Sequence, residues 1–155
     1  MPLTVTDYSP SDVLAQLLIR VGQASDWLSS GRPEGEWPVS AGMEPDSPDS
    51  VITIYDTEGV GGVRDHITGV PDGPLGFQVR VRSTTHRYAW SKASAVYKYL
   101  SETLYRQGVS IGDRYYLVHS CDLFGDILSL GKESPNSQRS IVVFNATVNL
   151  SDQTP

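Results

Sequence analysis

Alternating apolar and polar positions mark two strands in this chain. Between residues 75 and 82, large apolar side chains occupy every second position, with glycine, glutamine or arginine between them. Between Arg139 and Leu150 the same period of two recurs, with asparagine and threonine at the alternate positions. Because successive side chains of a strand point to opposite faces, each segment is predicted to have one buried face. Arg80 and Arg82 are expected on the solvent-facing side of their strand.

Three shorter apolar runs are also predicted to be strands. Val51–Tyr55 is rich in β-branched side chains and follows a proline-rich loop that cannot form a helix interior. Tyr115–Cys121 and Leu123–Leu130 come later, and Gly125 indicates a bulge or break in the second. The last three strands are joined too closely for parallel crossovers, so they are predicted to form an antiparallel meander.

Two segments repeat apolar residues every three or four positions, which is the period of a helix with one buried face. The first is predicted from Pro10 to about Leu28, with Ser9 as its N-cap. The second is predicted from about Tyr88 to Gln107 and is closed by Gly108.

These elements predict one α+β domain over residues 1–155. Its sheet is expected to be mostly antiparallel with about four to five strands, and the two main helices pack on one face. Residues 31–50 are predicted to be an irregular loop and residues 151–155 a loose tail. Residues 59–73 contain five glycines and are predicted to be an extended loop or hairpin arm.

The N-terminal segment, the apolar window of the first helix and the single cysteine argue against a secreted, a membrane-spanning and a disulfide-bonded protein. No basic segment typical of a signal peptide precedes the first helix, and its apolar window at Val13–Val21 carries Gln16 and Arg20, so no membrane span is predicted. Cys121 is the only cysteine, which excludes an intrachain disulfide and fits a reducing compartment.

Charge is distributed unevenly along the chain. Residues 1–72 contain twelve acidic and three basic residues, whereas residues 73–101 contain five basic residues and no acidic one. The overall charge of −6 disfavours tight wrapping of DNA, which depends on lysine and arginine. A chain with one acidic and one basic region can instead attract copies of itself head to tail, and such contacts can close into a ring.

Candidate catalytic and metal-binding residues are few. His119 and Cys121 share a predicted strand and leave a small hydrolase or metalloenzyme open as an alternative, although a buried structural cysteine is favoured. The three histidines are isolated from one another, and the acidic side chains near Val51–Tyr55 lack a calcium-loop pattern, so no metal and no cofactor are expected. The glycines at 59–62 lack the spacing of a phosphate-binding loop. The chain is therefore predicted not to be an enzyme.

Basic and aromatic residues alternate through the second predicted helix and the strand before it. Single-stranded nucleic acid binds to such surfaces, but protein interfaces use the same residue types. We favour contact between subunits and keep a nucleic-acid-binding module as an alternative. The residues concerned are Arg80, Arg82, Arg87, Tyr88, Trp90, Lys92, Tyr97, Lys98 and Tyr99.

Three motifs in this order resemble the minor capsid and tail terminator proteins of long-tailed bacteriophages. Residues 45–57 read PDSPDSVITIYDT, which resembles the family's proline and aspartate loop before a strand ending in Tyr-Asp. Residues 77–84 read FQVRVRST and precede an amphipathic helix, and residues 139–148 read RSIVVFNATV, which is similar to the family's final strand. With the N-terminal helix, the resemblance spans nearly the whole chain.

The resemblance implies a structural virion protein in the phage neck or tail, made in the cytoplasm of the bacterial host. It implies a ring, commonly of six copies, that stops growth of the tail tube and joins the tail to the head connector. The sheet would lie near the lumen, through which DNA passes without specific binding, and an acidic surface would repel that DNA. A neighbouring head-completion or stopper protein remains the alternative.

Two sets of residues follow from the resemblance and the charge pattern together. The first set is expected at the interface between copies and comprises Asp46, Asp49, Asp56, Glu58, Arg80, Arg82, Arg87 and Lys92. The second set lies in the arm and is expected to contact the tail tube protein; it comprises Val60, Val63, Arg64, Asp65, His66 and Ile67.

Overall fold

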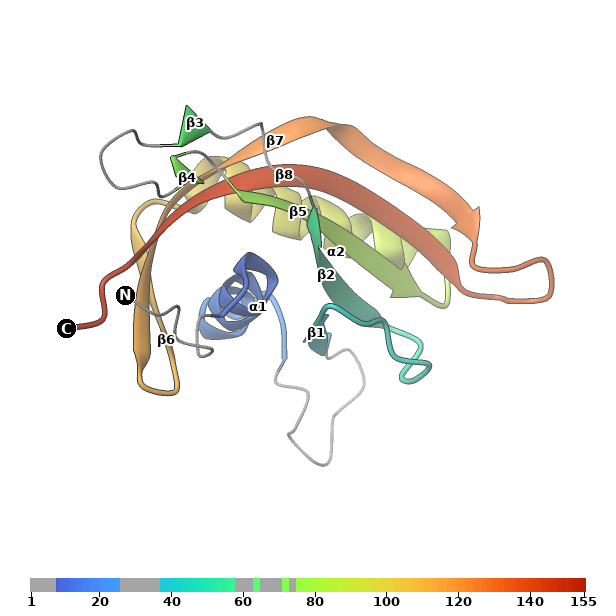
Figure 1. The fold of residues 1–155 in the computed structure, drawn as a ribbon. Coiled ribbons are helices and arrows are strands. Elements are labelled where there is room, and N and C mark those ends of the chain that lie inside the picture. The colour runs from blue at the N-terminus through green and yellow to red at the C-terminus, as the bar shows by residue number, and fades with distance from the viewer. Residues whose placement is uncertain (1–7, 26–36, 58–62, 65–70, 73–74) are drawn as a thin grey trace.

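A computed structural model shows an α+β fold in which a curled sheet surrounds one helix and packs against a second (Figure 1). The structure describes residues 8–25, 37–57, 63–64, 71–72 and 75–155. The helices are α1 (Pro10–Arg20) and α2 (His86–Lys98), and α2 continues into the π-helical turn η1 (Tyr99–Thr103). The strands are β1 (Val39–Ala41), β2 (Val51–Thr57), β3 (Val63–Arg64), β4 (Pro71–Asp72), β5 (Leu75–Ser83), β6 (Gln107–Ile111), β7 (Arg114–Lys132) and β8 (Ser140–Asp152).

Six of these strands form one sheet in the order β1-β2-β5-β8-β7-β6. β1 and β2 are parallel, and every other neighbouring pair in this sheet is antiparallel. The sheet is therefore larger than the predicted four to five strands, and it is mixed. β6, β7 and β8 form an antiparallel meander, but it is not the predicted one, because two of the three predicted strands are parts of β7 and β6 was not predicted. β3 and β4 pair separately as a short antiparallel hairpin.

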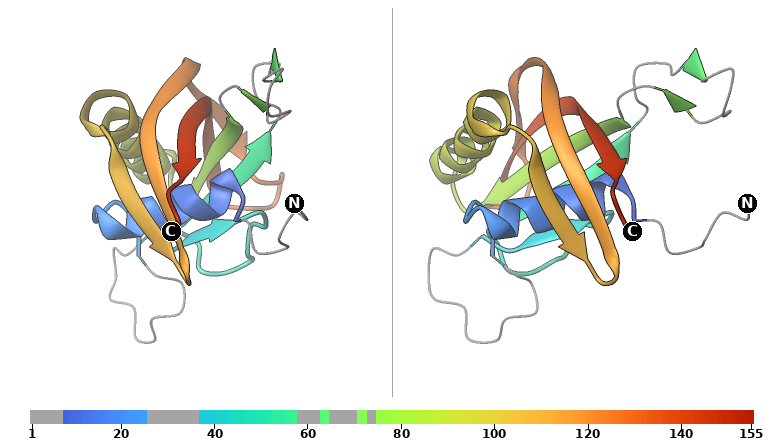
Figure 2. Two further views of the ribbon diagram at one scale, coloured as in Figure 1. Left: turned by 60° about the vertical axis from the view of Figure 1, so that its left-hand side comes forward. Right: turned by 90° about the vertical axis from the view of Figure 1, so that its left-hand side faces the viewer.

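One face of the sheet carries the core. In β5 the alternation predicted from the sequence is confirmed, because Phe77, Val79 and Val81 are fully buried. The helices cover that same face, with α1 against β1, β2 and β6 and α2 against β5, β7 and β8 (Figure 2). The opposite face of the sheet, which points away from both helices, is called the outer face below.

Helix α1 begins as predicted and ends early. The Ser9 hydroxyl accepts a bond from the Asp12 backbone amide, and the Asp12 carboxylate accepts one from the Ser9 amide, which completes a capping box. The helix ends at Arg20 and not near Leu28, because Gly22 adopts a left-handed φ of 81° and turns the chain away. Neither helix of the described residues is long and apolar enough to cross a membrane.

The second helix also ends before the predicted residue. It begins at His86 behind the N-cap Thr85, and η1 brings it to a close at Thr103. Gly108 is not a helix cap but lies in β6, where the ring of Tyr115 occupies the space that a side chain at 108 would need. The prediction failed because a glycine under an aromatic ring in a strand and a glycine after a helix look alike in sequence.

β7 joins two predicted strands into one strand of 19 residues. Gly125 does mark an irregularity, since the register with β8 shifts between Phe124 and Leu128. β1 lies inside the loop predicted to be irregular, and it pairs with β2. The tail that we expected to be loose is partly held, since Ser151 and Asp152 extend β8 and the Gln153 amide donates to the Tyr115 carbonyl.

Candidate functional site

A buried arginine organises one end of the outer face. Arg82 is only 1% exposed, and its Nη1 donates to Glu44 Oε1 over 2.9 Å. Its Nη2 donates to the Pro48 carbonyl over 2.8 Å, and its Nε to the Asp49 carbonyl over 3.3 Å. One guanidinium therefore binds a carboxylate and two carbonyl oxygens, and it fixes the loop of residues 42–50 against the sheet.

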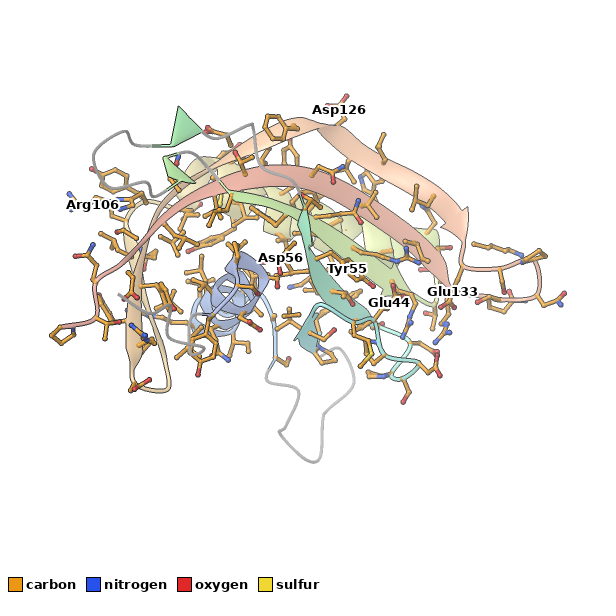
Figure 3. The ribbon with its side chains drawn as sticks, viewed as in Figure 1. Glu44, Tyr55, Asp56, Arg106, Asp126 and Glu133 are labelled. Carbon is orange, nitrogen blue, oxygen red and sulfur yellow. The ribbon has the colours of Figure 1, made fainter. Side chains whose placement is uncertain are left out.

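Further charges surround Arg82. Glu133 Oε1 lies 3.5 Å from Arg82 Nη1, and Glu133 Oε2 lies 2.6 Å from Arg139 Nη2. Arg139 also donates to the Asp46 carbonyl and lies 3.7 Å from Asp49 Oδ1. Glu44 and Glu133 thus approach the same end of the sheet from two loops that are far apart in sequence (Figure 3).

We call this set the charged cluster; it comprises Glu44, Asp49, Arg80, Arg82, Glu133 and Arg139. The Nε of Arg80 lies beside Glu44 Oε2 but off the line of a hydrogen bond, so that contact is an ion pair. Three positive and three negative side chains balance within the cluster. Its arrangement suits a fixed platform for the two loops, because a buried charge needs its partners in place.

The charged cluster corrects the expectation that both arginines of β5 face solvent. The alternation of β5 does place Arg80 and Arg82 on the outer face, but the loop of residues 42–50 folds back over that face and buries Arg82. The acidic loop and the arginines meet within one copy of the chain, whereas the predicted contact was between copies. Arg80 keeps 29% of its side chain exposed.

The other residues predicted at the interface between copies are spread over several elements. Asp46, Asp49 and Arg87 are exposed, whereas Lys92 is half-buried and burial lowers its pKa. Asp56 accepts bonds from the amide and hydroxyl of Ser11, over 2.9 and 2.7 Å, and thereby ties the end of β2 to the first turn of α1. Contact of these residues with a second copy stays a prediction.

The arm predicted at residues 59–73 is described in part. Val63 and Arg64 form β3 and pair with β4, so this segment does contain a hairpin, which Figure 1 shows apart from the six-stranded sheet. Four of the residues predicted to contact the tail tube lie outside the described residues, as does one residue predicted at the interface; these are Glu58, Val60, Asp65, His66 and Ile67.

The middle of the outer face carries uncharged polar side chains. Tyr55 of β2, Gln78 of β5 and Asn145 of β8 stand side by side in register, and Gln78 Nε2 donates to Asn145 Oδ1 over 3.2 Å. Thr57 and Asn149 are exposed nearby on the same face. Arg80, in the adjacent row, is ion-paired with Glu44. Toward β7 these rows end in exposed apolar side chains, since Phe124 is in register with Asn145 and Leu128 with Val143.

Large apolar side chains are exposed on β7 and on α2. In β7, Leu128 is 53% and Leu130 54% exposed, and Phe124 is similarly open. On α2, Trp90 is partly exposed and its ring lies 5.7 Å from that of His86. Trp90 was among the residues favoured for contact between subunits. Phe124, Leu128 and Leu130 were not singled out, because an apolar pattern predicts a strand without showing that nothing covers it.

His119 and Cys121 do not form a nucleophile and base pair. His119 Nε2 lies 3.0 Å from Ser151 Oγ, which is its hydrogen-bond partner. Burial, with the nearby Asp122 carboxylate, raises the pKa of the Cys121 thiol to about 12, so it is protonated at neutral pH. This geometry agrees with the structural reading of Cys121. Among the described residues, His, Cys, Asp and Glu do not gather in any group of three that could hold a metal ion.

Comparison with known proteins identifies a relationship over most of the chain. The family model of a bacteriophage tail terminator protein matches residues 26–152. That match includes every motif on which the resemblance in the sequence rested, and it confirms the resemblance. None of the curated proteins matches the sequence.

Proposed function

Because this chain belongs to the family of bacteriophage tail terminator proteins, and so is a structural component of a phage tail, we propose how it acts there. Copies of the chain form a ring, with six as the expected number, at the capsid-proximal end of the tail tube. The ring ends polymerisation of the tube and joins the tail to the head connector. The observation that carries this proposal is the family match over residues 26–152.

The outer face of the sheet supports a place beside the channel. Gln78, Asn145 and Asn149 offer amides there, whereas phosphate binding depends on lysine and arginine that release counterions. Arg80 and Arg82 are both paired with Glu44, and Glu133 also approaches Arg82. A face of this chemistry lets DNA pass without holding it, and the net charge of −6 acts in the same direction.

The β3–β4 hairpin supports a role for the arm in contact with the tail tube protein. Its two short strands pair with each other and not with the main sheet, so they do not contribute to the six-stranded architecture. A hairpin that projects from a rigid body is suited to engage a neighbouring protein. In this proposal the arm meets the last ring of the tube, and the opposite side of the ring meets the connector.

The length of tails made without this protein tests the proposal. A phage that carries an early stop codon in this gene is expected to produce overlong tubes without attached heads, and supply of the protein in trans restores normal length. Electron microscopy of lysates measures both. Tails of normal length beside heads that have lost their DNA would instead indicate a stopper at the head, and the terminator role would be abandoned.

A further inference from the structure

Two loops of the chain lie at the end of the sheet that is opposite the β3–β4 hairpin. The hairpin lies between the end of β2 and the start of β5, whereas the loop of residues 42–50 precedes β2 and the turn of residues 133–139 precedes β8. Val51 of β2 and Ile141 of β8, which follow the loop and the turn, lie in one row of the sheet. Since β2 spans seven residues, about 20 Å of strand separates this end from the hairpin end. Figure 1 shows the hairpin on one side of the molecule and both loops on the other.

Arginine side chains join the loop and the turn into one surface. Arg139 of the turn donates to the Asp46 carbonyl of the loop, and Arg82 binds two further carbonyl oxygens of the loop. Arg139 also pairs with Glu133 over 2.6 Å, at the start of its own turn. We call this surface the platform; it comprises residues 42–50 and 133–139.

The platform is held by ionic groups although apolar packing can give equal stability. A buried ion pair is often no more stabilising than well-packed hydrophobic residues of similar volume. The bonds of Arg82 and Arg139 provide direction instead, since each guanidinium fixes particular carbonyl oxygens of the loop. The loop therefore has one conformation before a partner arrives, and little ordering is needed when it binds.

The loop presents an apolar side chain between carboxylates. Met43 is 76% exposed, the highest value among the large apolar side chains of the described residues. The loop contains three acidic and no basic residues. Glu44 turns inward to the arginines of β5, whereas Asp46 and Asp49 are exposed. Within the described residues, the Asp46 carboxylate takes part in no ion pair.

The turn adds uncharged polar side chains to the platform. Ser134, Asn136 and Gln138 are exposed, and the two charged residues of the turn, Glu133 and Arg139, pair with each other. The exposed charge of the platform is therefore negative and comes from the loop. A partner that fits this surface has lysine or arginine side chains around an apolar hollow.

We infer that the platform receives the head connector, through a face of that protein with basic side chains around an apolar hollow. Met43 fills the hollow, because a flexible thioether adapts to an irregular apolar surface, and Asp46 and Asp49 pair with the basic side chains. This inference rests on the proposed function, in which the arm meets the tube and the opposite side of the ring meets the connector. Each copy in the ring offers the same platform, so weak single contacts add up to firm attachment.

Variants supplied in trans to a phage with an early stop codon in this gene test the inference. The platform variant carries Met43→Lys and Asp46→Lys, two exposed side chains outside the charged cluster, so it should fold. The control carries the same kinds of change away from the platform, Tyr105→Lys and Asp126→Lys, and Figure 3 shows Asp126 apart from Glu44. A conservative variant carries Met43→Leu and Asp46→Glu.

Urea denaturation first compares the stability of the three variants with that of the unaltered protein. Electron microscopy of lysates then measures tail length and the fraction of tails that carry heads. The platform variant is expected to end tails at the normal length but to join at least tenfold fewer of them to heads. The control and the conservative variant are expected to join heads as the unaltered protein does.

Three results would overturn the inference. The platform variant could join heads at the unaltered level, or a platform variant of unaltered stability could give overlong tails, which would place the platform against the tube. The control could lose joining to the same extent, and the effect would then not depend on this surface. Tails of normal length with no protein supplied would instead overturn the proposed function itself.

Discussion

At the scale of single residues, the structure separates charges that serve the fold from charges available to partners. Arg82 was predicted to be an exposed interface residue, yet it binds Glu44 and two carbonyl oxygens of its own chain. The period of β5 predicted which face Arg82 occupies. What covers that face depends on a loop more than thirty positions earlier in the chain, and no local pattern contains that information.

Replacement of Arg82 is expected to lower stability strongly. Arg82→Met removes the buried guanidinium and leaves two carbonyl oxygens and part of the Glu44 carboxylate without their donor, which costs about 3 to 5 kcal/mol. Arg87→Met is the matched control, since Arg87 is exposed, and it should change stability by about 0.5 kcal/mol or less. Urea denaturation measures both. Equal, small effects of the two substitutions would show that the charged cluster does not hold the loop.

The Cys121 thiol gives a second test at this scale, through pH. Burial raises its pKa to about 12, so below the ordinary pKa of a thiol, near pH 9, the folded and unfolded chains carry the same proton. Above that pH the unfolded chain loses the proton first, and stability falls as pH rises toward 12. The unaltered protein should therefore lose stability relative to Cys121→Ala as the pH rises from about 9 toward 12.

Thiol labelling checks the same property directly. At pH 8 a folded thiol with this pKa has roughly a thousandfold less thiolate than an unfolded one, so reaction with a thiol reagent should be slower by at least about two orders of magnitude than in denaturant. Rapid labelling of the native protein would mean that Cys121 is accessible and ionised, and the hydrolase alternative would return.

At the scale of elements, local signals predicted beginnings better than ends. Ser9 and its capping box set the start of α1, and the alternation in β5 and β8 predicted two strands and their buried faces. The ends of both helices were wrong, because a left-handed glycine and a π-helical turn stop them while the apolar period continues. β1 and β6 are short and bordered by glycine. Their pairing with β2 and β7, and not a pattern in their own sequence, makes these segments strands.

The cap of α1 provides a test of an element. Ser9→Ala removes the acceptor for the Asp12 amide and half of the capping box, and should lower the stability of the protein by about 1 kcal/mol. Ser9→Asn should restore most of that loss, because asparagine is an equally good N-cap residue. Thermal and chemical denaturation measure the effect. If Ser9→Ala leaves stability unchanged, contacts such as Asp56 with Ser11 hold this helix end without the cap.

At the scale of the whole molecule, the sequence predicted the fold class and the family, and it predicted that acidic and basic regions meet. It did not predict that the meeting occurs inside one copy, nor where exposed apolar groups lie. Leu128 and Leu130 are exposed because no other element of the described chain covers that part of β7, which is a property of the whole fold and not of the β7 sequence. Surfaces for assembly therefore emerge only once the strand order is known.

The central claim, a ring at the head-proximal end of the tail with the outer face toward its channel, is tested most directly by cryo-electron microscopy of the virion neck. The account predicts a ring of identical copies of this chain on the last ring of the tube. Gln78 and Asn145 would face the DNA, and α2 would lie on the outside. A neck that lacks this chain, or a ring that turns its helices toward the DNA, would contradict the account.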